Sequence, residues 1–388
     1  MIVGVAKETY PDESRVALVP ASLPALSKEG AELRIETGAG NAAGYPDEHY
    51  TEKGGKLAAT RSELFGAADV VLLVRAYGPE PERGTELEGL RSGQLVIGLF
   101  DPLYEAKAID QMARTGAALF ALELLPRITR AQSMDVLSSM ATVAGYKAVL
   151  IAADLAPRMF PMLITAAGTL TPARVFVIGA GVAGLQAIAT ARRLGAVVEA
   201  FDLRPAVREQ VESLGGKFVE LPLETQEAED AGGYAKAQEE TFYRRQQEMM
   251  TRVVAQSDVV ITTAAVPGQK APVLISKEMV LGMAPGSVII DLAAERGGNC
   301  ELTEPGERVV EHGVTILGPL NLAASVPYHA SQMYSRNIAS FLTHLIKNGK
   351  IELNLEDEIT RETLLARDGK VVHPKLLELL GRAPTAAG

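Results

Sequence analysis

Residues 173–202 read ARVFVIGAGVAGLQAIATARRLGAVVEAFD: an apolar run, a glycine-rich turn, a helical segment and a second apolar run that ends in an acid. The turn contains Gly179, Gly181 and Gly184 at the spacing that permits a tight turn, close approach of a pyrophosphate and close helix–strand packing. Asp202 follows Gly184 by 18 residues. A carboxylate there accepts hydrogen bonds from the adenosine ribose and repels a 2′-phosphate. The stretch therefore predicts a strand–helix–strand unit that binds a dinucleotide, NAD rather than NADP.

Two neighbours of this turn, Val182 at the start of the helix and Leu203 after Asp202, are expected to line the same cofactor. Arg204 favours NADP instead, because a nearby arginine can receive a 2′-phosphate. Its alternative interpretation is a solvated residue that opens a helix before Pro205. Glycines at such a turn can also serve a ligand-free strand–helix connection, but the aspartate beyond them favours a ligand.

The rest of the chain alternates short apolar runs with helix-like stretches, which is typical of parallel α/β sheets. Strands are expected at residues 2–6, 32–36, 69–74, 95–100 and 118–123, and then at 173–179, 196–202, 217–221, 258–264, 287–293 and 314–318. The six strands of the second block match a doubly wound nucleotide-binding sheet.

Two long helices are expected, over residues 132–156 with Ser133 as N-cap, and over 327–347. We predict an α/β fold of two doubly wound domains, one Rossmann and one flavodoxin- or Rossmann-like, joined by the two helices across a cleft. The first domain combines residues 1–135 and 328–380, the nucleotide domain spans 136–327, and 381–388 is a tail. Residues 348–388 look irregular apart from a hairpin at 366–373.

Two further stretches follow strands of the second block, at the edge where open α/β sheets bind ligands. One is TTAAVPG (262–268), in which Ala264, Ala265 and Pro267 are candidate contacts of the nicotinamide half of the cofactor. The other is DLAAERGGN (291–299). Both can equally be ordinary strand-to-helix turns.

Composition limits the classes of partner. A net charge of −10 disfavours nucleic acid and anionic membranes. The single Cys300 allows neither an internal disulfide nor a cysteine zinc cluster, and it is expected to be an inert thiol. No targeting signal and no membrane-spanning helix are expected, since charged residues and prolines interrupt the apolar region at 148–181. These features predict a cytoplasmic protein.

A dehydrogenase that acts on an alcohol or amine also moves a proton, usually through His, Lys or a carboxylate. Four histidines, His49, His312, His344 and His373, are expected to be solvated. His329 at the start of a long helix is the one cleft candidate for a base, but a polar helix-start residue is the favoured interpretation. The acidic insertion at 224–250, with Gly233 and Tyr234 at its centre, predicts either a lid or a surface loop.

Five stretches resemble motifs of a known protein family: GVAKETYPDESRVALVP, RITRAQSMDVLSS, GAGVAGLQAIATARRLGAVVEAFD, AGGYAK and PGSVIIDLAAERGGNC. Together they resemble the NAD(H)-binding component of proton-translocating NAD(P) transhydrogenase, from residue 1 to about 375. RAQSMD and AGGYAK are specific to it, whereas the glycine-rich turn is not. Alanine dehydrogenase shares the fold. The resemblance places that enzyme's substrate lysine at Leu73, its catalytic histidine at Phe100 and its acid at Glu295. Leu73 and Phe100 cannot perform those roles, so amino-acid oxidation is disfavoured.

The resemblance gives RITRAQSMD (127–135) a task that needs no acid or base. Hydride transfer between two nicotinamides needs the rings face to face with water excluded. Arg127 is then expected to donate to the carboxamide oxygen, while Asp135 and Ser138 accept from its amide or fix the loop. Gln132 reaches toward the second nucleotide. Without the resemblance, the stretch is a capped helix start with solvated arginines, and Arg130 has no assigned role.

The resemblance further implies that Tyr234 closes over NAD(H), that the chain forms a homodimer, and that partners supply an NADP(H)-binding component and a membrane-spanning, proton-translocating component. The implied reaction is NADH + NADP+ = NAD+ + NADPH, with the chain peripheral on the cytoplasmic side of the membrane. An NAD-dependent amino-acid dehydrogenase and a non-catalytic NAD(H) sensor remain as alternatives.

Overall fold

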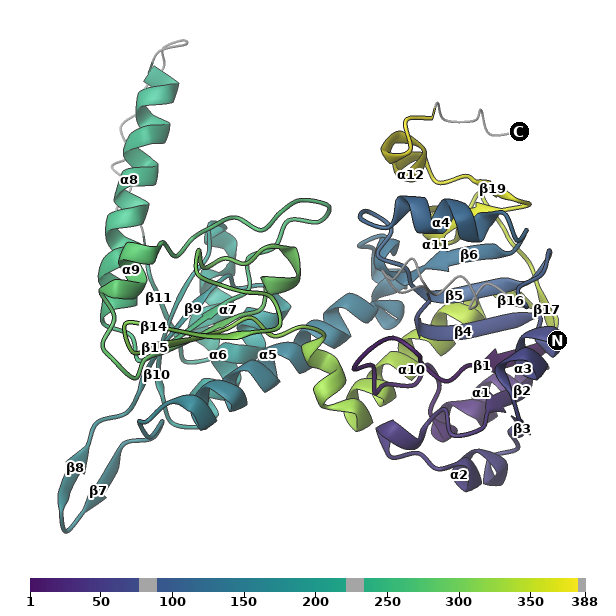
Figure 1. Cartoon of the computed structure of the whole chain (residues 1–388), viewed down its shortest axis with the longest axis horizontal. Helices are drawn as coiled ribbons and strands as arrows, with labels where there is room; N and C mark the ends of the chain where they lie inside the picture. The colour runs from purple at the N-terminus through teal and green to yellow at the C-terminus, as the bar shows by residue number, and fades with distance from the viewer. Residues whose placement is uncertain (77–88, 221–233, 383–388) are drawn as a thin grey trace. The chain divides into compact units, whose positions relative to one another are not determined.

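The chain divides into two compact units, shown in Figure 1, which are described separately below. The computed structural model describes residues 1–76, 89–220 and 234–382, with the backbone alone at 234–243. Unit 1 contains Met1–Met140 and Ala323–Gly388, and unit 2 contains Ala141–Leu322. The first division falls inside helix α5 (Val136–Leu155), which the sequence had placed wholly in the second domain. Helix α10 (Pro327–Leu345) lies wholly in unit 1.

Unit 1 is built on an eight-stranded sheet of order β19-β18-β6-β5-β4-β1-β2-β3. Its strands are β1 Ile2–Val5, β2 Glu32–Glu36, β3 Lys56–Ala58, β4 Val70–Arg75, β5 Leu95–Leu99, β6 Ala118–Ala121, β18 Leu364–Arg367 and β19 Lys370–Val371. Strands β1 to β6 are parallel, and β18 and β19 extend the edge antiparallel. Around the sheet lie α1 Leu23–Lys28, α2 Asp47–Glu52, α3 Arg61–Ala67, α4 Ala106–Ala113, α10, α11 Glu358–Thr363 and α12 Pro374–Leu379.

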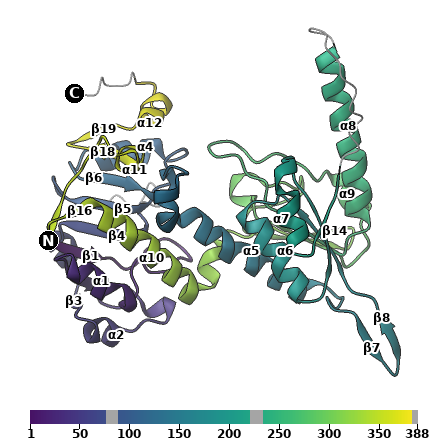
Figure 2. The ribbon, with the colours of Figure 1, turned by 180° about the vertical axis from the view of Figure 1, so that it is seen from behind.

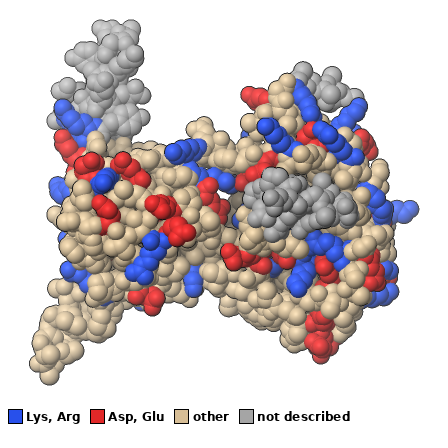
Figure 3. Space-filling model, viewed as in Figure 1, with Lys and Arg blue, Asp and Glu red and all other residues tan. Residues whose placement is uncertain are grey.

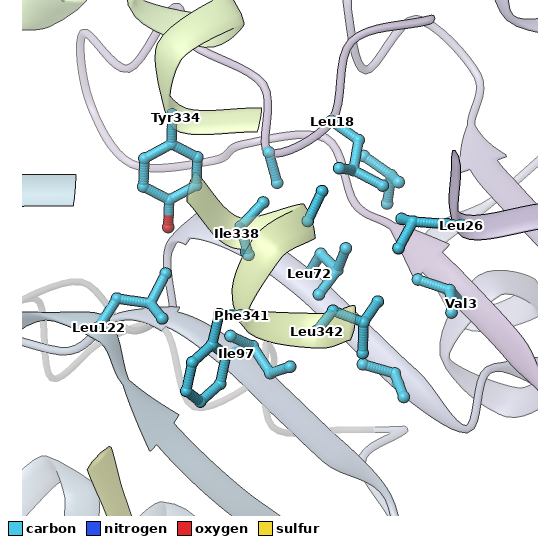
Figure 4. Packing of buried hydrophobic residues seen from close by; sticks show 14 of the residues in the cluster. Val3, Leu18, Leu26, Leu72, Ile97, Leu122, Tyr334, Ile338, Phe341 and Leu342 are labelled. Carbon is cyan, nitrogen blue, oxygen red and sulfur yellow. The ribbon is translucent and has the colours of Figure 1, made fainter. Parts of the chain in front are cut away.

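Both faces of this sheet are buried, which explains the uninterrupted apolar runs in its strands. Along β4, Leu72 and Val74 pack into one core cluster, while Val71 and Leu73 pack into another. Helix α10 covers the first face, as Figure 4 shows, with Phe341 near Phe120 at a ring separation of 5.8 Å.

Small polar residues of α10 also bind the loop after β1. Ser331 and Ser335 accept hydrogen bonds from the backbone N–H groups of Val16 and Val19, each at 3.0 Å. These bonds satisfy buried backbone donors that no strand partner reaches. The loop is therefore held against the helix that seals the core.

Unit 2 carries a seven-stranded sheet of order β11-β10-β9-β12-β13-β15-β14. Its strands are β9 Arg174–Ile178, β10 Val197–Phe201, β11 Lys217–Phe218, β12 Val259–Thr262, β13 Val288–Asp291, β14 Arg308–Glu311 and β15 Val314–Leu317. Six are parallel in the doubly wound order, and β14 is an antiparallel edge. Its helices are α6 Val182–Arg193, α7 Arg208–Ser213, α8 Tyr234–Ala255, α9 Lys277–Leu281 and most of α5.

The expected α/β class with two doubly wound sheets is confirmed, and the six parallel strands of unit 1 follow the same order as those of unit 2. The expected hairpin at 366–373 is also confirmed, with Asp368 and Gly369 at positive φ in its turn. One expectation about the fold is wrong. Residues 348–382 are not irregular, because they contain α11, α12 and three short strands (β17 Lys350–Ile351, β18 and β19). The sequence did not predict the edge strand β14. It also did not predict a hairpin of β7 (Leu163–Thr165) and β8 (Gly168–Leu170), and this hairpin projects from unit 2 in Figure 2.

Helix α5 bears on the expectation that the chain has no membrane-spanning helix. By length and composition it qualifies as able to cross a membrane, the one such helix among the described residues. Its side chains nevertheless serve a protein core: Ala148, Val149 and Ala152 are fully buried in a cluster of unit 2. At Gly145 the helix lies so close to α6 that an added Cβ would be 2.1 Å from the carbonyl oxygen of Ala183.

Gly145→Ala should therefore destabilise unit 2 by about 1–3 kcal/mol, the usual cost of overpacking a core. The matched control is Gly66→Ala in α3, where an added Cβ meets nothing within 4 Å. That change should stabilise unit 1 by about 0.4–1 kcal/mol, because alanine loses less backbone freedom on folding. Urea unfolding followed by circular dichroism measures both. Equal stability of the two variants would contradict the close helix contact.

Candidate functional site

The three glycines of the turn after β9, Gly179, Gly181 and Gly184, have three different structural roles, at the point where the strand order reverses. Gly179 has φ +94°, a left-handed conformation that favours glycine. A Cβ at Gly184 would lie 1.8 Å from the carbonyl oxygen of Gly179, so only glycine lets α6 pack on this turn. A Cβ at Gly181 would meet nothing within 4 Å, which leaves open space beside the N-terminus of α6. An anion is favoured at such a helix end.

Asp202 ends β10 beside this turn, as the sequence predicted. Its carboxylate accepts a hydrogen bond from the backbone N–H of Ala180 at 2.7 Å, which ties the second strand to the glycine-rich turn. It also accepts three from Arg204, which is therefore ion-paired and not simply solvated. Partial burial acts to raise the pKa of Asp202, but the bonds from Arg204 outweigh it and the pKa is lowered. The carboxylate is charged at neutral pH.

Residues 262–268, which follow β12, form a further wall beside the glycine-rich turn and Asp202. Thr263 donates to the carbonyl oxygen of Gly179 at 3.0 Å. Ala264 is held on both sides by the side chain of Asn299, which accepts from its N–H at 2.9 Å and donates to its carbonyl oxygen at 2.8 Å. Ala265 and Pro267 are exposed, as are Val182 and Leu203. The backbone of this stretch thus borders the turn and is held there by Asn299.

Sequence reasoning missed the residue that organises this wall. Asp291 is fully buried at the end of β13 and accepts from the side chains of Thr262 and Thr303 and from the backbone N–H groups of Ala293, Asn299 and Cys300. A buried carboxylate with five donors fixes the loop that carries Asn299. The available signal was the acid inside an otherwise apolar strand end, SVIIDLA.

The polar stretch 127–135 belongs to unit 1. It forms a 3₁₀ helix, η5 (Thr129–Met134), before α5 begins. Ala131 and Met134 are buried in the unit 1 core, while Arg127 and Gln132 are exposed. The loop is therefore anchored by its apolar residues and presents its long polar ones outward.

Two contacts from the C-terminal part of unit 1 hold this loop. Asn337 of α10 donates to the carbonyl oxygen of Ser133 at 2.8 Å. Arg130 pairs with Asp357 at 2.9 Å, so the structure gives it the anchoring role that spacing did not.

The N-cap of α5 is Asp135, and the expectation of Ser133 is wrong. The Asp135 carboxylate accepts from the backbone N–H of Ser138 at 2.9 Å and from its hydroxyl at 2.6 Å. Ser133 lies inside η5, where its side chain is exposed. Asp135 and Ser138 thus bind each other, which is the loop-fixing alternative of the sequence analysis.

The remaining expected site residues lie elsewhere. Gly233 is outside the described residues, and of Tyr234 the structure describes only its backbone, at the start of α8. Glu295 is exposed and accepts from the backbone N–H of Asn321 at 2.6 Å. Cys300 is a buried thiol whose pKa burial raises to about 11, consistent with an inert side chain.

The histidines differ partly from expectation. His329 is exposed and lies edge-on to Tyr328. His373 is buried, which lowers its pKa, and His344 is half-buried beside Asp357, so these two are not solvated.

Comparison with known proteins decides the family. The alanine dehydrogenase/PNT N-terminal domain matches residues 4–144, and the corresponding C-terminal domain matches residues 148–374. The chain belongs to the alanine dehydrogenase/PNT family.

Within this family the transhydrogenases are the nearer branch. The first part of the NAD(P) transhydrogenase alpha subunit of Rhodospirillum rubrum is 46% identical over 379 residues, 97% of this chain and 99% of that protein. The transhydrogenase of Sinorhizobium meliloti superposes with a TM-score of 0.83 at 44% identity, covering 96% of this chain and 99% of that one. An alanine dehydrogenase of Methanococcus maripaludis is 27% identical over 390 aligned positions, 96% of this chain and 95% of that protein. The resemblance to a transhydrogenase component is thereby confirmed.

The separation of the two branches drawn on Leu73 and Phe100 stays a prediction. Both side chains are buried in the same apolar cluster of unit 1, so in this chain neither faces a ligand. The polar residues at these strand ends are Arg75, stacked over Tyr10 at 5.0 Å, and Asp101.

The strand ends of unit 1 hold buried acids. Burial raises the pKa of Glu8 to about 8, helped by repulsion from Glu13 and opposed by hydrogen bonds from the N–H groups of Val74 and Arg75. Burial likewise raises the pKa of Glu123 to about 7. One oxygen of Glu123 accepts from the N–H of Asp101 at 2.7 Å, and the other is buried without a hydrogen-bond partner.

A carboxyl group whose pKa is raised on folding stabilises the protein below its unfolded pKa and loses that contribution as pH rises through the folded value. For Glu123 the window runs from 4.5 to about 7. Glu123→Gln keeps the acceptor for Asp101 and removes the charge. At pH 8 it should be more stable than the parent by about 3 kcal/mol, since each pKa unit corresponds to about 1.4 kcal/mol.

At pH 4.5 the two proteins should unfold with nearly the same free energy. Urea titrations at both pH values measure the difference, with Glu358→Gln on exposed α11 as the surface control. A difference that does not change with pH would contradict an uncharged, buried Glu123.

Proposed function

We propose that this chain is the NAD(H)-binding component of a proton-translocating NAD(P) transhydrogenase. The reaction is NADH + NADP+ = NAD+ + NADPH, of the Re/Si-specific type, and it needs partner components. NADP(H) is bound by a partner, and a separate membrane component translocates protons. The chain is then cytoplasmic and attached to the membrane through these partners. The observation that carries the proposal is the glycine turn closed by Asp202, in a chain so similar to transhydrogenase alpha subunits.

The residues of unit 2 fit a dinucleotide on physical grounds. The open space at Gly181 and the N-terminus of α6 suit a pyrophosphate, and the Asp202 carboxylate suits the adenosine ribose. Ala264, Ala265 and Pro267 line the nicotinamide half. Gly233 and Tyr234 are further candidate contacts of NAD(H), and Tyr234 is the first residue of α8. NAD(H) supplies a hydride at C4 of its nicotinamide, and the chain need only orient that ring and exclude water.

Orientation falls to the loop of unit 1. The Arg127 side chain is exposed and not part of the buried core, and it donates to the carboxamide oxygen. Asp135 and Ser138, which bind each other, fix the loop or accept from the carboxamide N–H. Gln132 is exposed and suits contact with the nucleotide held by the partner component. None of these roles requires proton transfer.

The deciding experiment measures hydride transfer from NADPH to an NAD+ analogue with shifted absorbance. The chain is assayed with and without an NADP(H)-binding component. We expect transfer only when both proteins are present. Turnover of alanine with NAD+ by this chain alone would instead establish an amino-acid dehydrogenase, and tight NADH binding with no transfer in the pair would establish a sensor.

In the same assay, Gln132→Asn shortens the side chain by one methylene. We expect NADH affinity within about two-fold of the parent and transfer slower by about 10- to 100-fold, because misplacement near 1 Å has that effect on a positioned reaction. The matched control is Ser133→Ala, the exposed neighbour that binds Asn337 through its backbone only. Equal losses of affinity and of rate in Gln132→Asn would refute an interface role.

We also propose that the chain is a homodimer through unit 2. The β7–β8 hairpin and its approach expose Met159, Met162, Ile164 and Leu170, at 53%, 57%, 77% and 49% of their surfaces. Residues 159–173 contain no charged side chain, and the hairpin stands out uncharged in Figure 3, whereas acidic and basic groups mix over the rest of the visible face. An uncharged apolar projection of this kind suits a second copy of the chain.

Ile164→Glu should convert the dimer to a monomer without unfolding unit 2, because a carboxylate would be desolvated in the interface. Sedimentation velocity gives the mass, and circular dichroism checks the fold. Val310→Glu on edge strand β14, at a side chain of similar exposure (58%), is the control and should remain dimeric. If Ile164→Glu keeps the parent mass, the hairpin is not the interface.

A further inference from the structure

The Asp202 carboxylate has no acceptor position left for a ribose. Its Oδ1 accepts from the backbone N–H and from Nε of Arg204, at 2.8 and 2.9 Å. Its Oδ2 accepts from the backbone N–H of Ala180 at 2.7 Å and from Nη2 of Arg204 at 2.9 Å. A carboxylate offers about four lone-pair positions. All four are therefore occupied, two by backbone groups and two by the Arg204 guanidinium.

The two kinds of bond differ in how easily they exchange. The backbone donors belong to the glycine turn and to the residues just after β10, so they stay in place. The Arg204 side chain is 62% exposed, whereas that of Asp202 is 8% exposed. Because the guanidinium is solvent-exposed, water replaces its hydrogen bonds when it moves away, so it leaves at little cost. Its departure frees two acceptor positions, which is the number of hydroxyl groups in a ribose diol.

We propose that Arg204 competes with the adenosine ribose for Asp202, and that this exchange sets the selectivity for NAD(H) over NADP(H). The inference rests on the proposed function, since it takes NAD(H) to bind at this turn. While Asp202 is charged, it neutralises Arg204 and repels a 2′-phosphate. Once Asp202 loses its charge, the guanidinium is released beside the ribose position, where it can bind a phosphate as a planar, bidentate donor.

The experiment measures dissociation constants for NADH and NADPH from the fluorescence of the reduced nicotinamide, using the full-length chain. The variants are Arg204→Ala, Asp202→Asn and the double variant. Asp202→Asn keeps a side-chain oxygen for the Ala180 N–H, and Arg204→Ala removes only an exposed side chain. Arg208→Ala is the matched control, because Arg208 is a similarly exposed arginine of α7 paired with Glu212 and Glu220 away from the turn.

Arg204→Ala should bind NADH about two- to five-fold more tightly, as expected from removing a weak competing ion pair. Asp202→Asn should bind NADH about ten-fold or more weakly, because hydrogen bonds to a charged acceptor are lost. It should also bind NADPH more tightly than the parent does. The double variant should lose that gain, and Arg208→Ala should match the parent for both nucleotides.

Weaker NADH binding by Arg204→Ala would overturn the proposal, since the guanidinium would then contribute a contact to the nucleotide. Equal NADPH affinity of Asp202→Asn and the double variant would overturn it as well. These outcomes are distinct from failure of the proposed function. A parent chain that binds NADH and shows the Arg204 effects, but transfers no hydride with its partner component, would refute the transhydrogenase role and leave this inference standing.

Discussion

The approach of α6 to the end of β9 is the constraint on which the nucleotide unit depends. An added Cβ at Gly184 would lie 1.8 Å from the Gly179 carbonyl oxygen, so the two elements touch backbone to backbone. The same carbonyl accepts from Thr263, which brings in the turn after β12. At Gly145 the backbone of α5 likewise lies against that of α6, beside the carbonyl group of Ala183. Three segments distant in sequence therefore meet at one helix start, and the open space over Gly181 is a consequence of that packing.

The parallel strands of the two units follow the same order. The two units differ in what lies at the strand ends where this order reverses. In unit 2 the strand ends carry glycines and small residues, and a helix N-terminus remains open to a ligand. In unit 1 the corresponding ends of β1 and β4 are filled by the chain itself. Glu8 accepts from the N–H groups of Val74 and Arg75, and the buried pair of Glu13 and Arg15 lies beside it. Buried charges remain only where such partners satisfy them. One sheet thus offers a nucleotide site, and the other supports a loop that faces outward.

Much of this was readable from the sequence because it depends on local patterns. Apolar runs located eleven parallel strands, and glycine spacing with Asp202 located the turn. What failed depends on which way a side chain points. Asp135 and Ser133 are both good caps, and only the course of η5 shows that Asp135 stands at the start of α5. The sequence also could not show that the Leu73 side chain lies in the core of unit 1, where the pleat of β4 places it. The acid at the apolar strand end could mark Asp291, but its role could not be predicted because its five donors come from three separate segments.

The loop at 127–138 shows why the C-terminal residues matter to a site they do not contact. Its backbone is fixed by Ala131 and Met134 in the core, by Asn337 on the Ser133 carbonyl and by Asp357 on Arg130. The Arg130 pair is exposed and contributes at most about 1 kcal/mol, so the buried apolar residues and the Asn337 bond set the geometry. Gln132 and Arg127 are consequently exposed side chains on a well-anchored backbone. An anchored backbone fixes the point from which each of these side chains extends, which is what the positioning role proposed for this loop requires.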